Sequence, residues 1–340
     1  MPGTNPSEAM RVIAGELPDF PHLPELPARG PGADITGRTA GLLVDIPVEV
    51  SPRGWRLSEH PGRDLNRAQT MLSSDLDVME EVLDGYQGLV KVQISGPWTL
   101  AATLELPRTL NVAIADPGAV ADLTASLAEG AAAHVAEVAK RLPGARIAVQ
   151  FDEPALAAVA GGEVPTASGL SRLRPVEAEV LRERLAQVIA AVRGYTVVHS
   201  CSTAVPFGLI REAGAGALSF DLSQLRRGEE DGVAEAAEAG LGLLIGAVPS
   251  VPEADTGTKP AQGPGGPGDG SAAARQTAER VIRLYHRLGL PLATGPEQVV
   301  ITPACGLAGA SPAYARAALT QCREAASMLA ELIEETGESS

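Results

Sequence analysis

The chain has 340 residues, of which 45% are hydrophobic and 20% charged, so it is neither disordered nor fibrous and can bury a sizeable core. Its formal net charge is −15 and it has no basic patch, which argues against binding to nucleic acid or to an anionic membrane surface. It contains no apolar run of about 18 residues and no signal-peptide pattern, so we expect a cytoplasmic protein without a membrane span.

Short apolar runs alternate along the chain with longer amphipathic stretches. The chain opens with a helical stretch at residues 7–17 and a weak extended segment at 20–25. Runs rich in β-branched residues predict strands at 89–94, 147–151, 196–199, 217–221, 243–248 and 299–302. Apolar stripes predict helices at 119–142, 176–192, 272–288 and 311–335. This alternation is typical of a parallel sheet wrapped by helices.

The length of the chain fits either two ordinary domains or one large barrel, and composition does not choose between them. The predicted fold class is α/β, a (β/α)8 TIM barrel in a single domain over residues 1–340. Residues 253–270, rich in Pro, Gly, Asp and Thr, are predicted to be a flexible loop. With segment 20–25 counted, the strands are one short of eight. Because a barrel without one strand exposes two unpaired edges, we expect that the first strand is missing from this chain. On this hypothesis Met1 is internal and the native protein begins roughly ten residues upstream.

Three of the predicted strands end in side chains that bind metals. His199 and Cys201 follow one strand, Asp221 ends the next, and Cys305 follows the last. In a TIM barrel the carboxyl ends of the strands meet at one mouth, where one nitrogen, two sulfurs and one carboxylate would suit tetrahedral zinc. The alternative is packing, because cysteine is often buried whatever its function. The third cysteine, Cys322, lies on the apolar face of a helix and is predicted to be a core thiol.

Two adjacent carboxylates, Asp152 and Glu153, stand at the end of another predicted strand. Side chains alternate along a strand, so at most one of them faces the mouth. A carboxylate there can bind a substrate ammonium or act as a base. The alternative is that Asp152 caps a helix whose first turn holds Glu153 and Pro154, and the local sequence favours neither reading.

The same motifs resemble a known family. Residues 150–156, Gln-Phe-Asp-Glu-Pro-Ala-Leu, resemble the signature Q-[IV]-D-E-P-A-L of cobalamin-independent methionine synthase. His199-Ser200-Cys201 resembles its H-x-C, and residues 303–307, Pro-Ala-Cys-Gly-Leu, resemble its N-P-D-C-G-L. Three motifs in the same order make a specific match. The resemblance spans most of the chain but covers only the carboxy-terminal catalytic barrel of that two-barrel enzyme, as in a short single-barrel relative.

The resemblance implies a zinc site and an amino-acid site. By it His199, Cys201 and Cys305 are zinc ligands, and Asp221 stands where the family usually has a Glu, with the charge kept and the reach shortened by one methylene. Asp152 matches the position that holds the amino group of homocysteine. Glu25 corresponds to a second amino-acid-binding Glu, in a sequence that otherwise differs.

The function that the resemblance implies is zinc-dependent methyl transfer to the thiol of homocysteine, which forms methionine. The methyl donor is 5-methyltetrahydrofolate or a methyl-corrinoid, the latter on a corrinoid carrier protein as a further partner. The family's His-bearing loop, implicated in protonating the folate, corresponds here to residues 248–270, which contain no histidine. Three alternatives stay open: methyl transfer to another thiol, a non-catalytic zinc-binding barrel, and a uroporphyrinogen-decarboxylase-like enzyme, which would not need the His and Cys set.

Overall fold

The computed structural model describes residues 1–252 and 270–337. The predicted flexible loop therefore lies outside the described residues, apart from Gly270, where a helix begins. None of the described helices is long and apolar enough to cross a membrane.

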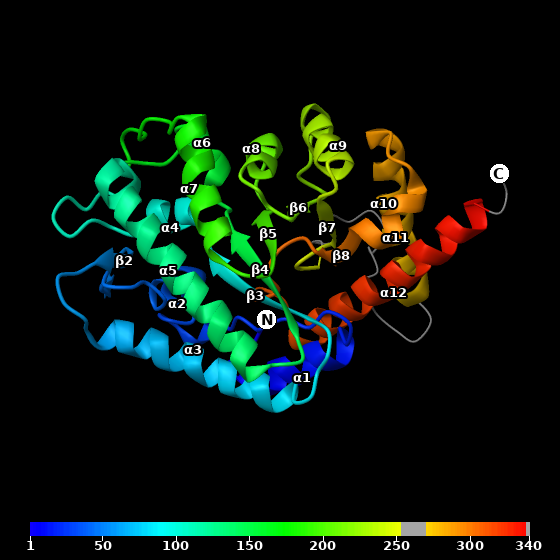
Figure 1. Ribbon diagram of the computed structural model, residues 1–340, viewed down its shortest axis with the longest axis horizontal. Coiled ribbons are helices and arrows are strands. Elements are labelled where there is room, and N and C mark those ends of the chain that lie inside the picture. Colours follow the sequence, from blue (N-terminus) through cyan, green and yellow to red (C-terminus); the bar gives the residue numbers. More distant parts are fainter. Residues whose placement is uncertain (253–269, 338–340) are drawn as a thin grey trace.

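A parallel sheet of six strands forms the centre of the fold, and its strands lie side by side in chain order (Figure 1). They are β3 (Leu89–Ser95), β4 (Arg146–Asp152), β5 (Tyr195–Ser200), β6 (Ala217–Asp221), β7 (Gly242–Val248) and β8 (Val299–Pro303). All six strands predicted from the apolar runs are thus confirmed, to within two residues at each end.

The weak extended segment at residues 20–25 also joins the sheet. The Lys91 amide of β3 donates to the Pro21 carbonyl at 2.9 Å, and the Leu23 amide donates to the Lys91 carbonyl at 2.9 Å. His22 thereby forms a parallel bridge with Lys91. Within residues 1–252 and 270–337, no strand pairs with the outer edge of this segment or of β8. The curled sheet is therefore a partial barrel.

Eight of the described helices cover the outer face of the sheet (Figure 1). They are α1 (Pro6–Glu16), α3 (Arg63–Val82), α5 (Pro117–Arg141), α7 (Ala178–Ala191), α8 (Phe207–Glu212), α9 (Glu230–Glu238), α10 (Gly270–Leu288) and α12 (Pro312–Gly337). The first of them precedes the extended segment, and each of the other seven comes after that segment or after one strand of the sheet. The first and last of them touch: the Thr320 hydroxyl donates to Glu16 Oε2 at 2.7 Å, and Arg323 donates to the Glu16 carbonyl at 2.8 Å. The helical layer is therefore continuous across the place where the sheet is open.

Shorter elements connect the strands and helices. They are α2 (Ile35–Ala40), the antiparallel hairpin of β1 (Val48–Ser51) and β2 (Gly54–Leu57), α4 (Pro97–Thr103), α6 (Leu156–Ala160), α11 (Gly295–Gln298), and the 3-10 turns Pro27–Arg29, Ala113–Ala115, Arg227–Glu229 and Leu292–Thr294.

Local sequence explains where the predicted helices begin. The Asn5 side chain accepts hydrogen bonds from the amides of Ser7 and Glu8, which caps α1. Asp116 does the same for α5 by accepting from the Gly118 amide at 2.8 Å, with a proline in the first turn. These caps satisfy amides that the helix itself leaves without partners.

The two faces of the sheet differ in polarity. On β3 the apolar residues Val90, Val92 and Ile94 are buried against the helices, while Lys91 and Gln93 alternate with them and point to the inside of the curl. A small apolar cluster, formed by Val197, Ala217 and Leu244 with Phe20 and Val300, fills part of that inside. The inside of the partial barrel is thus part apolar and part polar, and its polar part carries the candidate site.

Candidate metal and active site

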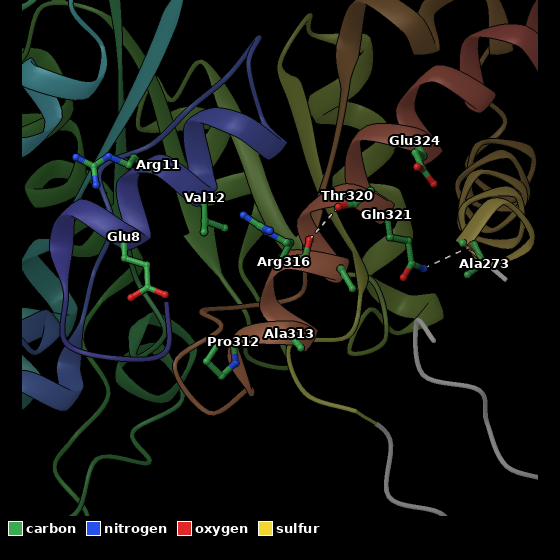
Figure 2. A pocket seen from close by; sticks show the side chains of 12 residues that line it. Glu8, Arg11, Val12, Ala273, Pro312, Ala313, Arg316, Thr320, Gln321 and Glu324 are labelled. Carbon is green, nitrogen blue, oxygen red and sulfur yellow. Dashed lines mark hydrogen bonds between the residues drawn. The ribbon is translucent and has the colours of Figure 1, made fainter. Parts of the chain in front are cut away.

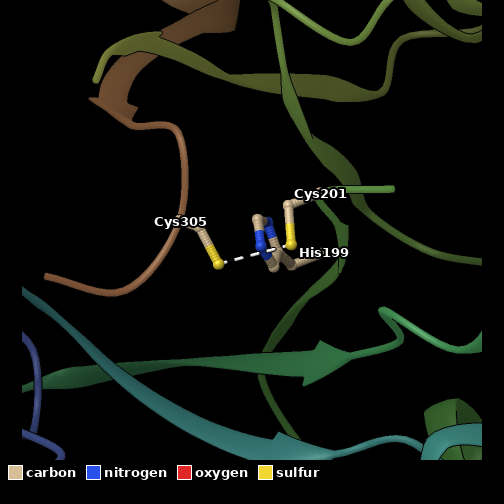
Figure 3. Close-up of side chains that lie close together, drawn as sticks. All are labelled: His199, Cys201 and Cys305. Carbon is tan, nitrogen blue, oxygen red and sulfur yellow. Dashed lines mark hydrogen bonds between the residues drawn. The ribbon is translucent and has the colours of Figure 1, made fainter. Parts of the chain in front are cut away.

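Three of the four predicted metal ligands lie together. His199 is on β5, Cys201 follows that strand, and Cys305 follows β8, and their ligand atoms lie within 4.8 Å of one another. Figure 3 shows the three side chains pointing toward one another from two separate segments, with Cys201 Sγ 3.3 Å from Cys305 Sγ. Residues more than a hundred positions apart therefore form one compact group of donors.

A second contact orients the imidazole. His199 Nδ1 lies 2.9 Å from the hydroxyl oxygen of Ser219, the residue that faces His199 in the register of β5 and β6. This contact leaves Nε2 of His199 to face a ligand. Such a partner on the second ring nitrogen is the usual arrangement around a metal-bound histidine.

The two thiols differ in their electrostatic surroundings. The neighbouring Cys201 and His199 side chains hold the pKa of Cys305 below its usual range. The hydrogen bond to Cys305, together with burial, raises the pKa of Cys201. Two thiols this close together therefore favour a single thiolate between them. An imidazole and two sulfurs, one of them readily ionised, form a donor set that fits zinc.

Asp221 stands apart from this group in the described structure. Its Oδ1 accepts hydrogen bonds from the Ser223 amide at 2.8 Å and the Ser223 hydroxyl at 2.7 Å. It lies two residues after Ser219 on β6, so alternation places both on the same face of the sheet. A role of Asp221 as the fourth ligand remains a prediction.

Asp152 lies beside the metal group, on the inner face of the sheet. It is the last residue of β4, is buried, and faces His199 in the register of β4 and β5. Burial raises the pKa of its carboxyl group, and the neighbouring charges of His199 and Lys91 oppose that rise. The capping alternative for Asp152 is wrong, since α6 has no side-chain cap.

Glu153 points the other way, as alternation requires, and is fully buried. Its carboxylate accepts hydrogen bonds from the Trp98 amide at 2.9 Å and from the Thr99 amide and hydroxyl, both at 2.7 Å. These are the first amides of α4, and a Cβ on Gly96 would clash with the Glu153 side chain. Burial raises the pKa of Glu153 to about 7. Glu153 therefore ties the end of β4 to α4, while Asp152 is left for the mouth.

Glu25 lies near Asp152, at the end of the extended segment. Its Oε1 is 3.6 Å from Nε of Arg38, which is itself bound to the buried Asp75 at 2.7 Å, and Arg29 binds the same Asp75 through two nitrogens. Burial raises the pKa of Glu25, Arg38 opposes the rise, and the charge of Asp152 adds to it. The two predicted substrate-binding carboxylates therefore interact directly through their charges.

Sequence reasoning gave no role to two polar side chains beside Asp152. Lys91 donates to Gln150 Oε1 at 2.9 Å, and Gln150 Nε2 donates to Asp152 Oδ1 at 2.7 Å. The signal for Lys91 was available, because Lys91, Gln93 and Ser95 alternate with apolar residues along β3. In a strand with helices on one side, such alternation indicates that the other face is polar.

A separate groove of about 830 Å³ lies on the helical layer, between α1, α10 and α12 (Figure 2). Its lining includes Glu8, Arg11, Arg316, Thr320 and Gln321. None of the predicted site residues lines this groove, so it is distinct from the candidate site.

Residues 2–256 match the sequence model of the family described as cobalamin-independent synthase, catalytic domain. The chain belongs to this family. The resemblance seen in the motifs is thus confirmed, and the matched range includes every predicted site residue except Cys305. Cys305 lies beyond the matched range, and its place in the site rests on the 3.3 Å between its Sγ and the Sγ of Cys201.

Comparison with solved structures supports the same fold. The structure of a B12-independent methionine synthase from Shewanella sp. W3-18-1, in complex with selenomethionine, is similar with a TM-score of 0.61 and 12% sequence identity. The similarity covers 97% of this chain and 89% of that one. At such low identity the similarity speaks for the fold alone. No curated protein matches the chain.

Proposed function

We propose that this chain is a zinc-dependent methyltransferase that moves a methyl group to the thiol of homocysteine and so forms methionine. The observation that carries the proposal is the group of His199, Cys201 and Cys305 with Asp152 beside it on the inner face of the sheet. Membership of the cobalamin-independent synthase family supports the same reaction. The structurally similar enzyme was solved with selenomethionine, the selenium analogue of the proposed product.

The zinc ligands in this proposal are His199, Cys201 and Cys305, with Asp221 as the fourth candidate. Bound zinc supplies a Lewis acid that keeps a substrate thiol in its nucleophilic thiolate form near neutral pH, whereas a free thiol has a pKa near 8.5. The protein's own part is to orient His199 through Ser219 and to hold two cysteines close together.

The amino-acid part of the substrate binds to carboxylates. Asp152 pairs with the ammonium group of homocysteine, and Glu25 adds a second negative charge beside it. Fixing the ammonium places the thiol toward the metal group, so the sulfur is aligned with the incoming methyl carbon. We also propose that the partial barrel is a TIM barrel of the (β/α)8 type, with this site at the carboxyl ends of its strands.

The methyl donor in this proposal is 5-methyltetrahydrofolate or a methyl-corrinoid, the latter delivered on a small carrier protein. Metal analysis of the purified protein, combined with homocysteine methylation assayed against both donors, tests the proposal. Zinc bound near one per chain, with methionine formed from either donor, is expected. A folded, zinc-loaded protein that forms no methionine from either donor would overturn it.

A further inference from the structure

A chain of hydrogen bonds runs through the inside of the partial barrel to Asp152. It starts at the ammonium group of Lys91 on β3, passes through the side-chain amide of Gln150 on β4, and ends at Asp152 Oδ1. Lys91 and Gln150 are diagonal neighbours, since Gln150 faces Gln93 in the register of the two strands. Gln150 is buried and Asp152 is buried, so water competes little for these bonds.

The direction of each bond follows from the chemistry of the groups. A lysine ammonium can only donate, so Lys91 requires the carbonyl oxygen of the Gln150 amide on its side. The NH₂ end of Gln150 must then face Asp152, where it donates at 2.7 Å. With the amide reversed, two acceptor oxygens would meet and repel each other. Lys91 therefore selects the amide orientation that binds a carboxylate.

The bond from Gln150 leaves one oxygen of Asp152 for a ligand. Oδ1 is held by Gln150, and among the described residues no hydrogen bond reaches Oδ2. Asp152 also stands opposite His199 in the strand register, so a carboxylate with a fixed orientation faces the metal group. A fixed carboxylate binds an ammonium more tightly than a mobile one because less side-chain freedom is lost on binding.

We propose that Lys91, acting through Gln150, is a positioning residue that orients Asp152 toward the ammonium group of a thiol-bearing amino acid. This inference rests on the proposed function, because it assumes that the substrate is an amino acid such as homocysteine. It deepens that function by assigning part of the selectivity for the amino group to two residues that do not touch the substrate.

Lys91 could act through its charge alone or by positioning Asp152, and the two roles predict opposite changes in ammonium binding when Lys91 is replaced. While Asp152 stays ionised, a Lys91 that acted only through its charge would repel an ammonium, and Lys91→Met would then strengthen the binding of that ammonium. Because Lys91 also lowers the pKa of Asp152, affinity is compared at a pH high enough to keep Asp152 ionised in both proteins. If Lys91 positions Asp152, the same change frees the Gln150 amide to rotate and weakens that binding. The sign of the change in affinity therefore separates the two roles.

The test measures the binding of two thiols to the zinc-loaded protein by calorimetry: homocysteine, and 4-sulfanylbutanoate, which lacks only the amino group. Lys91→Met is expected to lower the affinity for homocysteine about tenfold, which is the range of one charge-assisted hydrogen bond. The affinity for 4-sulfanylbutanoate should stay unchanged. Lys91→Arg, which keeps a donor, should restore most of the affinity. The surface variant Lys140→Met, on an exposed part of α5, is the matched control and should bind both thiols as the wild type does.

A double-mutant cycle shows whether the effect passes through Asp152. In the Asp152→Asn background, Lys91→Met should cause no further loss of homocysteine affinity. If Lys91→Met fails to fold by circular dichroism, Gln150→Met supplies the same comparison.

Three results would overturn the inference. Homocysteine binding that is unchanged or tighter in Lys91→Met excludes positioning and leaves the proposed function standing. Equal weakening of both thiols assigns Lys91 a structural role, with the same consequence. A wild-type protein that carries zinc but binds no homocysteine overturns the proposed function and this inference together.

Discussion

The two cysteines of the metal group provide the most direct residue-scale prediction. Cys201→Ser and Cys305→Ser should each lose most of the bound zinc, because a site with three protein donors in reach cannot spare a thiolate. Asp221→Ala should weaken zinc binding less, since Asp221 lies outside the group in the described structure. The measurement is zinc content after dialysis against a weak chelator.

Cys322 is the control for this series. It is buried in α12 among apolar side chains, and burial alone raises the pKa of its thiol. Cys322→Ser should therefore retain zinc at the wild-type level. Full zinc content in Cys305→Ser would remove that residue from the metal site.

Asp152 carries the second residue-scale prediction. Asp152→Asn should retain zinc but lower the affinity for homocysteine about tenfold or more, because a neutral amide pairs poorly with an ammonium group. Affinity is measured by calorimetry on the zinc-loaded variant, with zinc content determined in parallel. Unchanged affinity for homocysteine would place the amino group elsewhere.

Local sequence could name the candidate residues but not their directions. Asp152 and Glu153 are adjacent carboxylates, and either could have faced the mouth. The choice depends on α4, whose first amides bind Glu153 from more than fifty residues away in the chain. Ser219 was missed for a similar reason, because its contact with His199 arises from the register of β5 and β6 rather than from a local motif.

At the scale of elements, Glu153 joins a strand to a helix. Glu153→Ala should lower the free energy of unfolding by about 3 kcal/mol, because it leaves the buried amides of Trp98 and Thr99 without partners. Glu153→Gln should cost less, since its carbonyl oxygen can still accept one of these bonds. Urea unfolding at constant pH measures both.

The exposed Glu163 provides the comparison for Glu153. Glu163→Ala should leave stability within about 0.5 kcal/mol of the wild type, as is usual for surface substitutions. If Glu153→Ala were as stable as Glu163→Ala, the hydrogen bonds to α4 would contribute nothing to the fold.

The strands were easier to predict than the connections between them. Apolar runs marked every strand from β3 to β8, and the signal was strongest in β4 and β7, which are buried on both faces. The helix α3 was missed although it has 20 residues, since its buried face includes the charged Asp75 and its apolar stripe is broken there. Asp75 is tolerated because two arginines from outside α3 pair with it, which the sequence of the helix alone does not reveal.

At the scale of the whole molecule, the family could be predicted from three motifs and the α/β class from an alternating pattern, while the way the helices span the open side of the sheet could not. No local pattern predicted that α12 would contact α1 through Glu16 and bridge the open side of the sheet. Contacts between the two ends of a chain depend on the complete fold, so no local window contains them.

The stability of the whole molecule should fall as pH drops below 6.5, and His134 is one identifiable cause. His134 lies on the buried face of α5, where burial and the positive charge of Arg38 lower its pKa to about 4. The unfolded chain takes up a proton near pH 6.5, and the folded chain does so only near pH 4. This contribution to stability is therefore fully present above pH 6.5 and is lost as pH falls toward 4, by about 3 kcal/mol in total.

Replacing His134 with glutamine removes its titration and should flatten the profile between pH 7 and pH 4. The free energy of unfolding, measured by urea at several pH values, should drop by about 3 kcal/mol less in His134→Gln than in the wild type over that range. Both proteins keep the same metal group and the same Glu153, whose raised pKa acts in the opposite direction, so the difference between them isolates His134. His286 is exposed on α10, and His286→Gln should leave the wild-type slope unchanged. An identical slope in His134→Gln and the wild type would mean that His134 is protonated in the folded protein as readily as in the unfolded chain.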